Sequence, residues 1–132
     1  MSKYITIQST IFSVFASSNW QNEDIKTVPS NFTGEVNATE YIRVSIVYGA
    51  TNPLYQNLNA ISGMILIDVF VPSGTGPLRA SQISDLLDSY FVAKTIDSVQ
   101  FYTSSLKSLG RDRDNPSLDH SQYTILFSYN GA

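Results

Sequence analysis

The sequence predicts an α+β domain, in which a mostly antiparallel or mixed sheet of four to five strands carries two helices packed on one face. Three observations lead to this fold class. Apolar residues recur at helical spacing in residues 3–16 and 78–91. They alternate, or run together over the length of a strand, in residues 40–48 and 63–71. The order helix, strand, strand, helix, strand, strand favours helices gathered on one face of a sheet.

Length and composition fit a single domain over residues 1–132. Charged residues make up only 14% of the chain, against roughly 25% in an average soluble domain. A surface with so few charges is tolerable where other subunits cover part of it. The net charge of −3 gives no general attraction to nucleic acid or to an anionic membrane. Cysteine is absent, which excludes disulfides, thiolate zinc sites and cysteine nucleophiles.

Polar residues interrupt the N-terminal segment, so we expect no signal peptide there. No apolar run is long enough to span a bilayer, and we expect no membrane contact. The first helix is predicted over residues 3–16, and residues 17–19 should break it. Residues 21–39 contain proline, glycine and several asparagines, which indicates a connection with a short extended piece near residues 24–28.

Residues 40–48 alternate cleanly, which predicts a half-buried strand with Ile42, Val44 and Ile46 on one face and Tyr41, Arg43 and Ser45 on the other. Residues 49–62 look like a polar loop centred on an Asn-Pro pair.

Residues 63–71 are apolar on both faces, so this strand should lie near the centre of the sheet and end at Pro72. After the helix at 78–91, two more strands are predicted at 98–104 and 122–129. The segment 106–121 would join them, and it is long for a hairpin connection.

The stretch PSGTGP between the central strand and the second helix raises the question of a phosphate-binding loop. A dinucleotide fingerprint needs a third glycine where Arg79 stands, and a P-loop needs a lysine that is missing. Pro77 also removes one amide donor. We therefore interpret the stretch as a tight structural turn without a ligand or cofactor, built by four residues, Pro72, Gly74, Gly76 and Pro77.

Catalytic chemistry is not predicted. The one histidine, His120, follows Asp119 directly, and adjacent residues rarely face each other as a relay requires. Asp68 stands in an apolar strand. It either pairs with Arg43 on the neighbouring strand or lies on the less buried face. On the second helix, Ser81, Ser84, Asp85 and Asp88 form the polar face, and the two aspartates are interpreted as surface charges.

A second acidic group, Asp112, Asp114 and Asp119, lacks the glycine and the closing glutamate of a calcium loop. Arg111 and Arg113 would oppose a cation there. We interpret the segment as a mixed-charge loop that contacts a partner, with an adventitious ion as the alternative, and we predict no metal site.

Several segments resemble the tail terminator (tail completion) proteins of tailed bacteriophages. They are residues 41–49 (YIRVSIVYG), residues 63–76 (GMILIDVFVPSGTG) and the following helix with its Ile-x-x-Leu-Leu-x-x-x-Phe pattern. Residues 109–112 (LGRD) and 123–127 (YTILF) are similar to the last loop and strand of that family. The resemblance covers roughly residues 38–129. Its most specific part is the strand-Pro-x-Gly-x-Gly-helix unit with an arginine upstream.

The resemblance implies a structural protein of the virion without enzymatic activity or cofactor. Such proteins form a ring, usually of six subunits, on the head-proximal end of the tail tube, and are assembled in the cytoplasm of the bacterial host. Their partners are other copies of the same chain, the major tail tube protein and a head-completion or neck protein. DNA only passes through the lumen. One departure is the loop at residues 110–120, which is longer and more charged than a minimal hairpin needs.

Two alternatives remain open at this point, a neck connector protein and, from another class, a small ligand-binding or enzymatic domain. The long segments 49–62 and 106–120 are the predicted contact loops. The candidate interface residues are Arg43, Asn52, Leu54, Tyr55, Asp68, Arg111, Asp112, Arg113, Asp114 and His120.

Overall fold

The structure is a computed structural model, and it describes residues 3–30, 40–55, 58–74 and 77–131. The elements are α1 (Lys3–Ala16), α2 (Ser18–Asn22), β1 (Lys26–Pro29), β2 (Tyr41–Tyr55), β3 (Leu58–Pro72), α3 (Leu78–Phe91), β4 (Thr95–Ile96), β5 (Val99–Arg111) and β6 (Leu118–Gly131). The fold class is α+β, as expected. The sheet has six strands, however, where four to five were expected, because β1 and β4 are short strands at its two sides.

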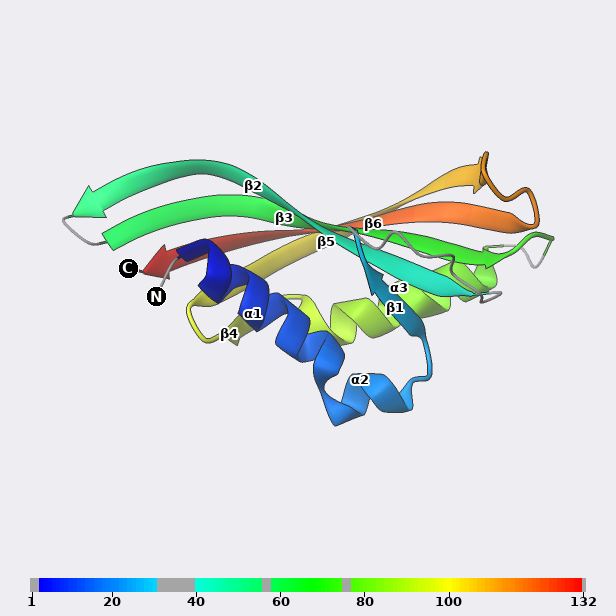
Figure 1. The fold of residues 1–132 in the computed structure, drawn as a ribbon, viewed down its shortest axis with the longest axis horizontal. Helices are drawn as coiled ribbons and strands as arrows, with labels where there is room; N and C mark the ends of the chain where they lie inside the picture. The colour runs from blue at the N-terminus through cyan, green and yellow to red at the C-terminus, as the bar shows by residue number, and fades with distance from the viewer. Residues whose placement is uncertain (1–2, 31–39, 56–57, 75–76, 132) are drawn as a thin grey trace.

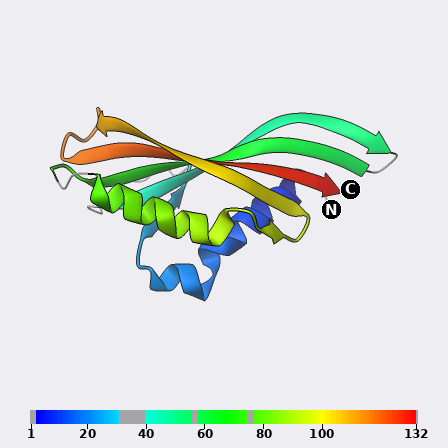
Figure 2. The same ribbon diagram turned by 180° about the vertical axis from the view of Figure 1, so that it is seen from behind.

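The strands follow the order β1-β2-β3-β6-β5-β4. β1 runs parallel to β2, and every other neighbouring pair is antiparallel, so the sheet is mixed. β3 lies near the centre of the sheet, as its apolar sequence predicted. Figures 1 and 2 show α1, α2 and α3 below the sheet, while its upper face carries no helix.

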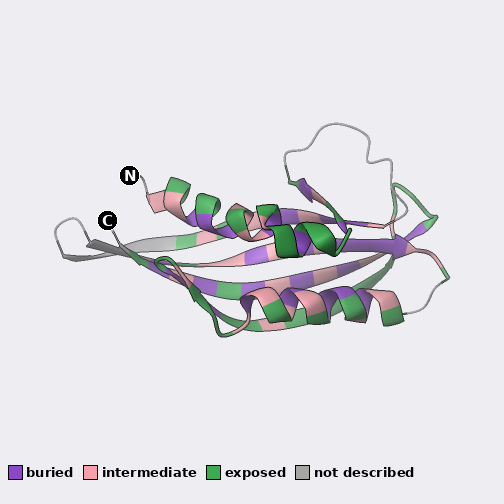
Figure 3. Cartoon of the chain, turned by 90° about the horizontal axis from the view of Figure 1, so that it is seen from below, coloured by how far each residue is buried: buried purple, intermediate pink, exposed green. Residues whose placement is uncertain are grey.

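The hydrophobic core lies between this helix layer and the sheet. The long helices have the predicted bounds, and each turns one apolar face inward, with Ile7, Ile11 and Phe15 buried on α1 and Ile83, Leu87 and Phe91 buried on α3. Figure 3 shows these buried stripes from the helix side. The rings of Phe91 and Phe101 meet edge to face at 5.1 Å, which joins α3 to β5. No helix among the described residues is both long and apolar enough to span a membrane.

The predicted break at residues 17–19 is only one residue long, because α2 starts at Ser18. Ser17 has an extended backbone, and its hydroxyl accepts a hydrogen bond from Trp20 N, which is the behaviour of an N-cap. The extended piece expected near residues 24–28 is present as β1. The remainder of that connection, residues 31–39, lies outside the described residues.

The prediction of a polar loop at residues 49–62 is wrong, because β2 continues to Tyr55 and β3 begins at Leu58. Two register shifts, between Tyr48 and Thr51 and between Pro53 and Tyr55, absorb the residues that looked like loop formers. Beyond Val44 this side of β2 has no partner strand in the described residues, so the missing N–H of a proline costs little there.

The loop predicted at residues 106–121 is also mostly strand. β5 extends to Arg111 and β6 begins at Leu118, so the connection is only residues 112–117. A register shift between Ser108 and Gly110 interrupts the pairing, and Gly110 has a φ of 83°, which favours glycine. The charged loop is therefore short, and most of the predicted contact segment belongs to the sheet.

Where the structure describes it, the glycine-rich stretch connects the strand β3 to the helix α3. Pro72 ends β3, and Ser73 N donates to Ser117 O at 2.8 Å. Gly74 follows with a φ of 87°. The Pro77 carbonyl accepts the first helical hydrogen bond, from Ser81 N. Gly76 lies outside the described residues.

Candidate interaction surfaces

Three rings form a stacked row on the helix-free face of the sheet. Tyr41 of β2 lies opposite Phe70 of β3, which lies opposite His120 of β6. The Tyr41 and Phe70 rings are 4.6 Å apart and 20° from parallel, and the Phe70 and His120 rings are 4.6 Å apart and 14° from parallel. Val28 and Leu118 complete a second buried cluster with Tyr41 and Phe70. This face therefore has a small core of its own, which we call the aromatic row.

Charged groups surround the aromatic row. His120 Nε2 lies 2.7 Å from Asp68 Oδ1, so the ring N–H donates to the carboxylate. Arg43 Cζ lies 5.9 Å from the centre of the Tyr41 ring and 5.7 Å from that of Phe70, within the range of a cation–π contact. Burial raises the pKa of the Tyr41 phenol, the Arg43 charge opposes the rise, and the charges of Asp112 and Asp68 add to it.

The expected pairing of Asp68 with Arg43 is not formed. Their Cα atoms are register partners, but in the described part of the chain Arg79 forms an ion pair with Glu40, and Asp68 accepts a hydrogen bond from His120. The carboxylate is taken by the histidine, and the guanidinium lies over the rings. Asp68 does lie on the less buried face, half-buried, which was the other possibility considered. In the described part of the chain, Arg43 Nε is buried without a hydrogen-bond partner.

Replacing Arg43 with alanine is expected to lower the free energy of unfolding by about 1 kcal/mol. The cation–π contacts are worth roughly 0.5–1 kcal/mol at a partly exposed site, and removal of an unsatisfied N–H offsets part of the loss. Arg43→Lys, which keeps the charge but not the flat guanidinium, is the matched control. Urea denaturation measures both variants. A loss above about 3 kcal/mol would mean that Arg43 holds a buried ion pair, and would contradict this geometry.

The other predicted interface residues are spread over the molecule. Asn52, Leu54 and Tyr55 belong to the last part of β2, and their side chains lie outside the described part of the structure. Arg111, Arg113 and Asp114 are exposed at and after the end of β5, and Asp112 is half-buried near Tyr41. The structure thus brings together Arg43, Asp68, Asp112 and His120, and leaves the remaining six elsewhere or undescribed.

Asp119 and His120 do not face each other, as expected for neighbours in a strand. Asp119 accepts a hydrogen bond from the Ser73 hydroxyl at 3.3 Å, whereas His120 binds Asp68. Among the described residues, no three histidine, aspartate or glutamate side chains converge as metal ligands would. Tyr41 and Phe70 were missed as members of a site. The signal was the apolar character of residues 63–71 on both faces, which implied a second buried side.

The interpretation of Asp88 as a surface charge is wrong. Its Oδ1 accepts hydrogen bonds from the Tyr123 hydroxyl and from the Ser104 hydroxyl, both at 2.6 Å, so it links α3 to β6 and β5. Ser84, also placed on the polar face, is buried and donates to the Ala80 carbonyl. Part of the polar side of α3 therefore meets the sheet. Burial, and then the hydrogen bond to Asp88, raise the pKa of Tyr123 well above its ordinary value.

Alkaline pH should expose the role of this tyrosine. The folded-state pKa lies above the unfolded value of about 10, so the stabilisation is complete below pH 10 and is lost as pH rises beyond it. Each unit of pH can remove about 1.4 kcal/mol per such group. Tyr123→Phe is expected to flatten the decline in unfolding free energy above pH 10, measured by urea denaturation. Tyr102→Phe, at an exposed phenol, should keep the wild-type slope, and equal slopes in all three proteins would contradict the expectation.

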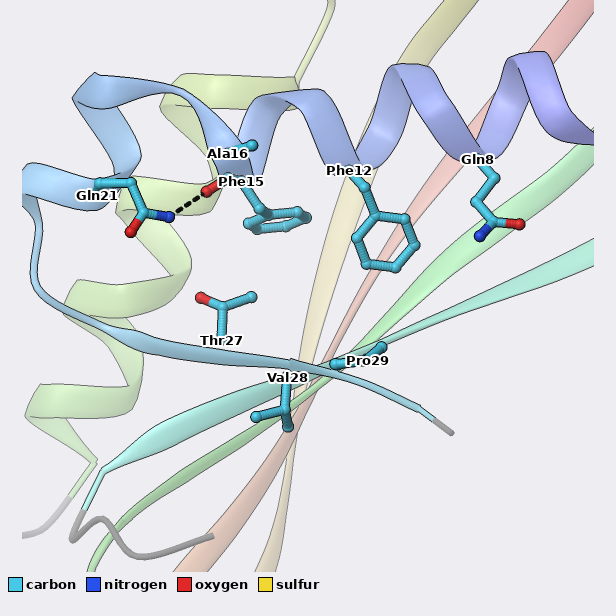
Figure 4. Close-up of a pocket in the computed structure, with 8 residues that line it drawn as sticks. All are labelled: Gln8, Phe12, Phe15, Ala16, Gln21, Thr27, Val28 and Pro29. Carbon is cyan, nitrogen blue, oxygen red and sulfur yellow. Dashed lines mark hydrogen bonds between the residues drawn. The ribbon is translucent and has the colours of Figure 1, made fainter. Parts of the chain in front are cut away.

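A pocket of about 450 Å³ lies between α1, α2 and β1. Figure 4 shows Gln8 and Phe12 of α1 above β1, with Phe15 facing Thr27. The Gln21 side chain closes one end by donating to the Phe15 carbonyl at 2.7 Å. A second pocket of about 240 Å³ shares Gln8, Phe12 and Pro29, and extends to the helix-side residues of β2, namely Val44, Ile46 and Tyr48.

Two strand edges in the described part of the sheet are open. β4 pairs with β5 only at Val99 and Gln100, and every residue of β5 from 105 to 111 is exposed. On the opposite side, β1 pairs with β2 only as far as Val44.

No protein-family model matches the chain, and no curated protein matches it. Six chains of solved structures match. One of them, a protein whose name states no function, is similar with a TM-score of 0.64 at 15% identity, over 98% of this chain and 96% of that one. At this identity the likeness shows a shared fold and nothing of function.

Proposed function

We propose that this chain is a structural virion protein of a tailed bacteriophage, a tail terminator that forms a ring on the head-proximal end of the tail tube. The ring, of six copies as in the family that the sequence resembles, would stop tube polymerisation and offer a surface to a head-completion or neck protein. DNA would pass through the lumen, and the chain would perform no catalysis.

The observation that carries this proposal is the unit formed by β3, the turn after Pro72 and α3. Its sequence is the most specific part of the resemblance, and the positive φ of Gly74 is one that a turn can require of a glycine. The low charge and the two strand edges that no described residue pairs support a chain that is completed by neighbours.

The test is electron microscopy of the purified protein, alone and with tail tubes assembled from the tube protein of the same virion. We expect rings, free or seated on one end of each tube, and tubes of limited length in their presence. A monomer at all concentrations that neither caps tubes nor binds a neck protein would end the proposal. Binding to the portal or adaptor in place of the tube end would favour a neck connector.

A further inference from the structure

The first open edge belongs to β5. Its window of residues 104–107 has β6 on one side and no partner on the other in the described part of the chain. Register shifts bound the window, one between Phe101 and Ser104 and one between Ser108 and Gly110. On its helix side lie two pockets, of about 540 and 200 Å³, because the residues facing α3 there are mostly small. Leu106 lines both pockets and is 43% exposed.

The second open edge belongs to β2, in the window Ser45 to Tyr48. β1 ends beside it, where Ser30 N donates to the Val44 carbonyl. The window contains no charge, no proline and no register shift, which are the usual means of protecting a strand edge. Val47 is 45% exposed on the helix-free face, while Ile46 lines the pocket beside α1. No described residue pairs with this side of the window, so the edge offers backbone donors and acceptors to another strand.

The directions of the two edges match. β2, β3, β6 and β5 are consecutive antiparallel neighbours, so β2 and β5 run in opposite directions. A second copy placed alongside in the same orientation therefore brings its β2 antiparallel to β5 of the first. Such contacts are heterologous, because they join two different patches of the same chain. They build a ring when the rotation that relates one copy to the next closes on itself.

The two windows also fit in register. Within one chain, Ser45 and Ser105 lie at the same level across the sheet. Ser45 pairs with Leu66, Leu66 with Thr124, and Thr124 with Ser105. A slide of about two residues along the strand, the kind of stagger that closed sheets require, sets Ile46 opposite Leu106 of the neighbour. Directly opposite residues of two paired strands point to the same face of the sheet. Ile46 and Leu106 meet this condition, because both lie on the helix side. Tyr48 then faces Ser104, so a large side chain meets a small one.

We propose that copies of this chain join head to tail by antiparallel pairing of residues 45–48 of β2 with residues 104–107 of β5 in the neighbour. This inference rests on the proposed ring, and it names the contact that builds it. The occupant of each edge is a second copy, because one chain carries both edges and a single contact satisfies them together.

Two edge variants test the pairing. Ser45→Lys with Val47→Lys places two charges on the β2 edge, opposite Lys107 of the neighbour, and Leu106→Lys places a charge inside the contact from the β5 side. The positions are exposed or half-buried, and circular dichroism checks that both variants fold. Under the conditions in which the wild type forms rings, each variant alone should remain a monomer by light scattering. In a mixture, β5 of the first variant can still pair with β2 of the second. The two should therefore form a 1:1 pair and nothing larger.

Cysteine cross-linking supplies a second measurement, since the chain has no cysteine of its own. Val47→Cys with Ser105→Cys should give a ladder of covalent oligomers on oxidation, and Val47→Cys with Ser89→Cys, on the exposed side of α3, should not. Rings that persist in either edge variant, or a variant that pairs with itself, would overturn the edge pairing and leave the terminator proposal standing. Cross-linked oligomers that never cap a tube would support the edge pairing and overturn the terminator proposal.

Discussion

Replacing Phe70 with alanine is expected to lower the free energy of unfolding by about 3–5 kcal/mol, the usual range for a buried phenylalanine. Phe70 is only 3% exposed although it lies on the face without helices. Its ring is held between Tyr41 and His120 at 4.6 Å on each side. Removal of the Phe70 ring opens a cavity and leaves Tyr41 and His120 without their stacking partner. A loss of this size is a large part of the 5–15 kcal/mol that stabilises a typical domain.

Urea denaturation measures the effect, and Leu126→Ala is the matched control. Leu126 lies on the same face and is 45% exposed, so its truncation should cost well under 1 kcal/mol. If Phe70→Ala were as mild as the control, the aromatic row would be a surface arrangement without a core of its own. The His120→Ala variant should fall between the two, because Phe70 keeps its contact with Tyr41.

Replacing Gly63 with valine should also lower the free energy of unfolding strongly. Gly63 lies in β3, between Tyr48 of β2 and Phe127 of β6. A Cβ on this residue would lie 2.5 Å from the Val47 carbonyl oxygen and 2.8 Å from Phe127 Cζ. The phenyl ring can turn, but the carbonyl belongs to the backbone of the neighbouring strand. Overpacking of this kind costs about 1–3 kcal/mol or more, and the valine adds two further methyl groups.

The expected result is a large drop in the urea midpoint for Gly63→Val and a smaller one for Gly63→Ala. Ser62→Val is the control, since residue 62 is exposed on the same strand and valine is favoured in strands. Should Gly63→Ala match the wild type, the close approach of β2 and β6 over this glycine would be ruled out.

The helices could be predicted from the sequence because their signals are local. Apolar spacing marked both ends of α1, and Pro77 marked the start of α3. The central position of β3 followed from its apolar residues on both faces. The strand ends could not be predicted in the same way. Gly49, Pro53 and Gly110 are turn formers by propensity, but register shifts and an unpaired edge allow them within strands.

The contacts between charged groups were harder to predict. Register alone places Arg43 beside Asp68, and it is correct for the Cα atoms. The carboxylate nevertheless turns to His120, whose position depends on where β6 begins, and that start was misplaced. Asp88 shows the same limit, since its partners lie 16 and 35 residues away. Such pairings depend on tertiary geometry that single-sequence periodicity does not encode.

The sheet can also be considered as a folding problem. β2–β3 and β5–β6 are hairpins whose strands are close in sequence, while the contact of β3 with β6 joins residues that are 46 to 72 positions apart. Loop-closure entropy opposes such a distant contact until the local structure exists. We therefore expect the two hairpins to form first and the β3–β6 seam to close last. Since β3 and β6 lie at the middle of the sheet, this late seam is also what makes the six strands one cooperative unit.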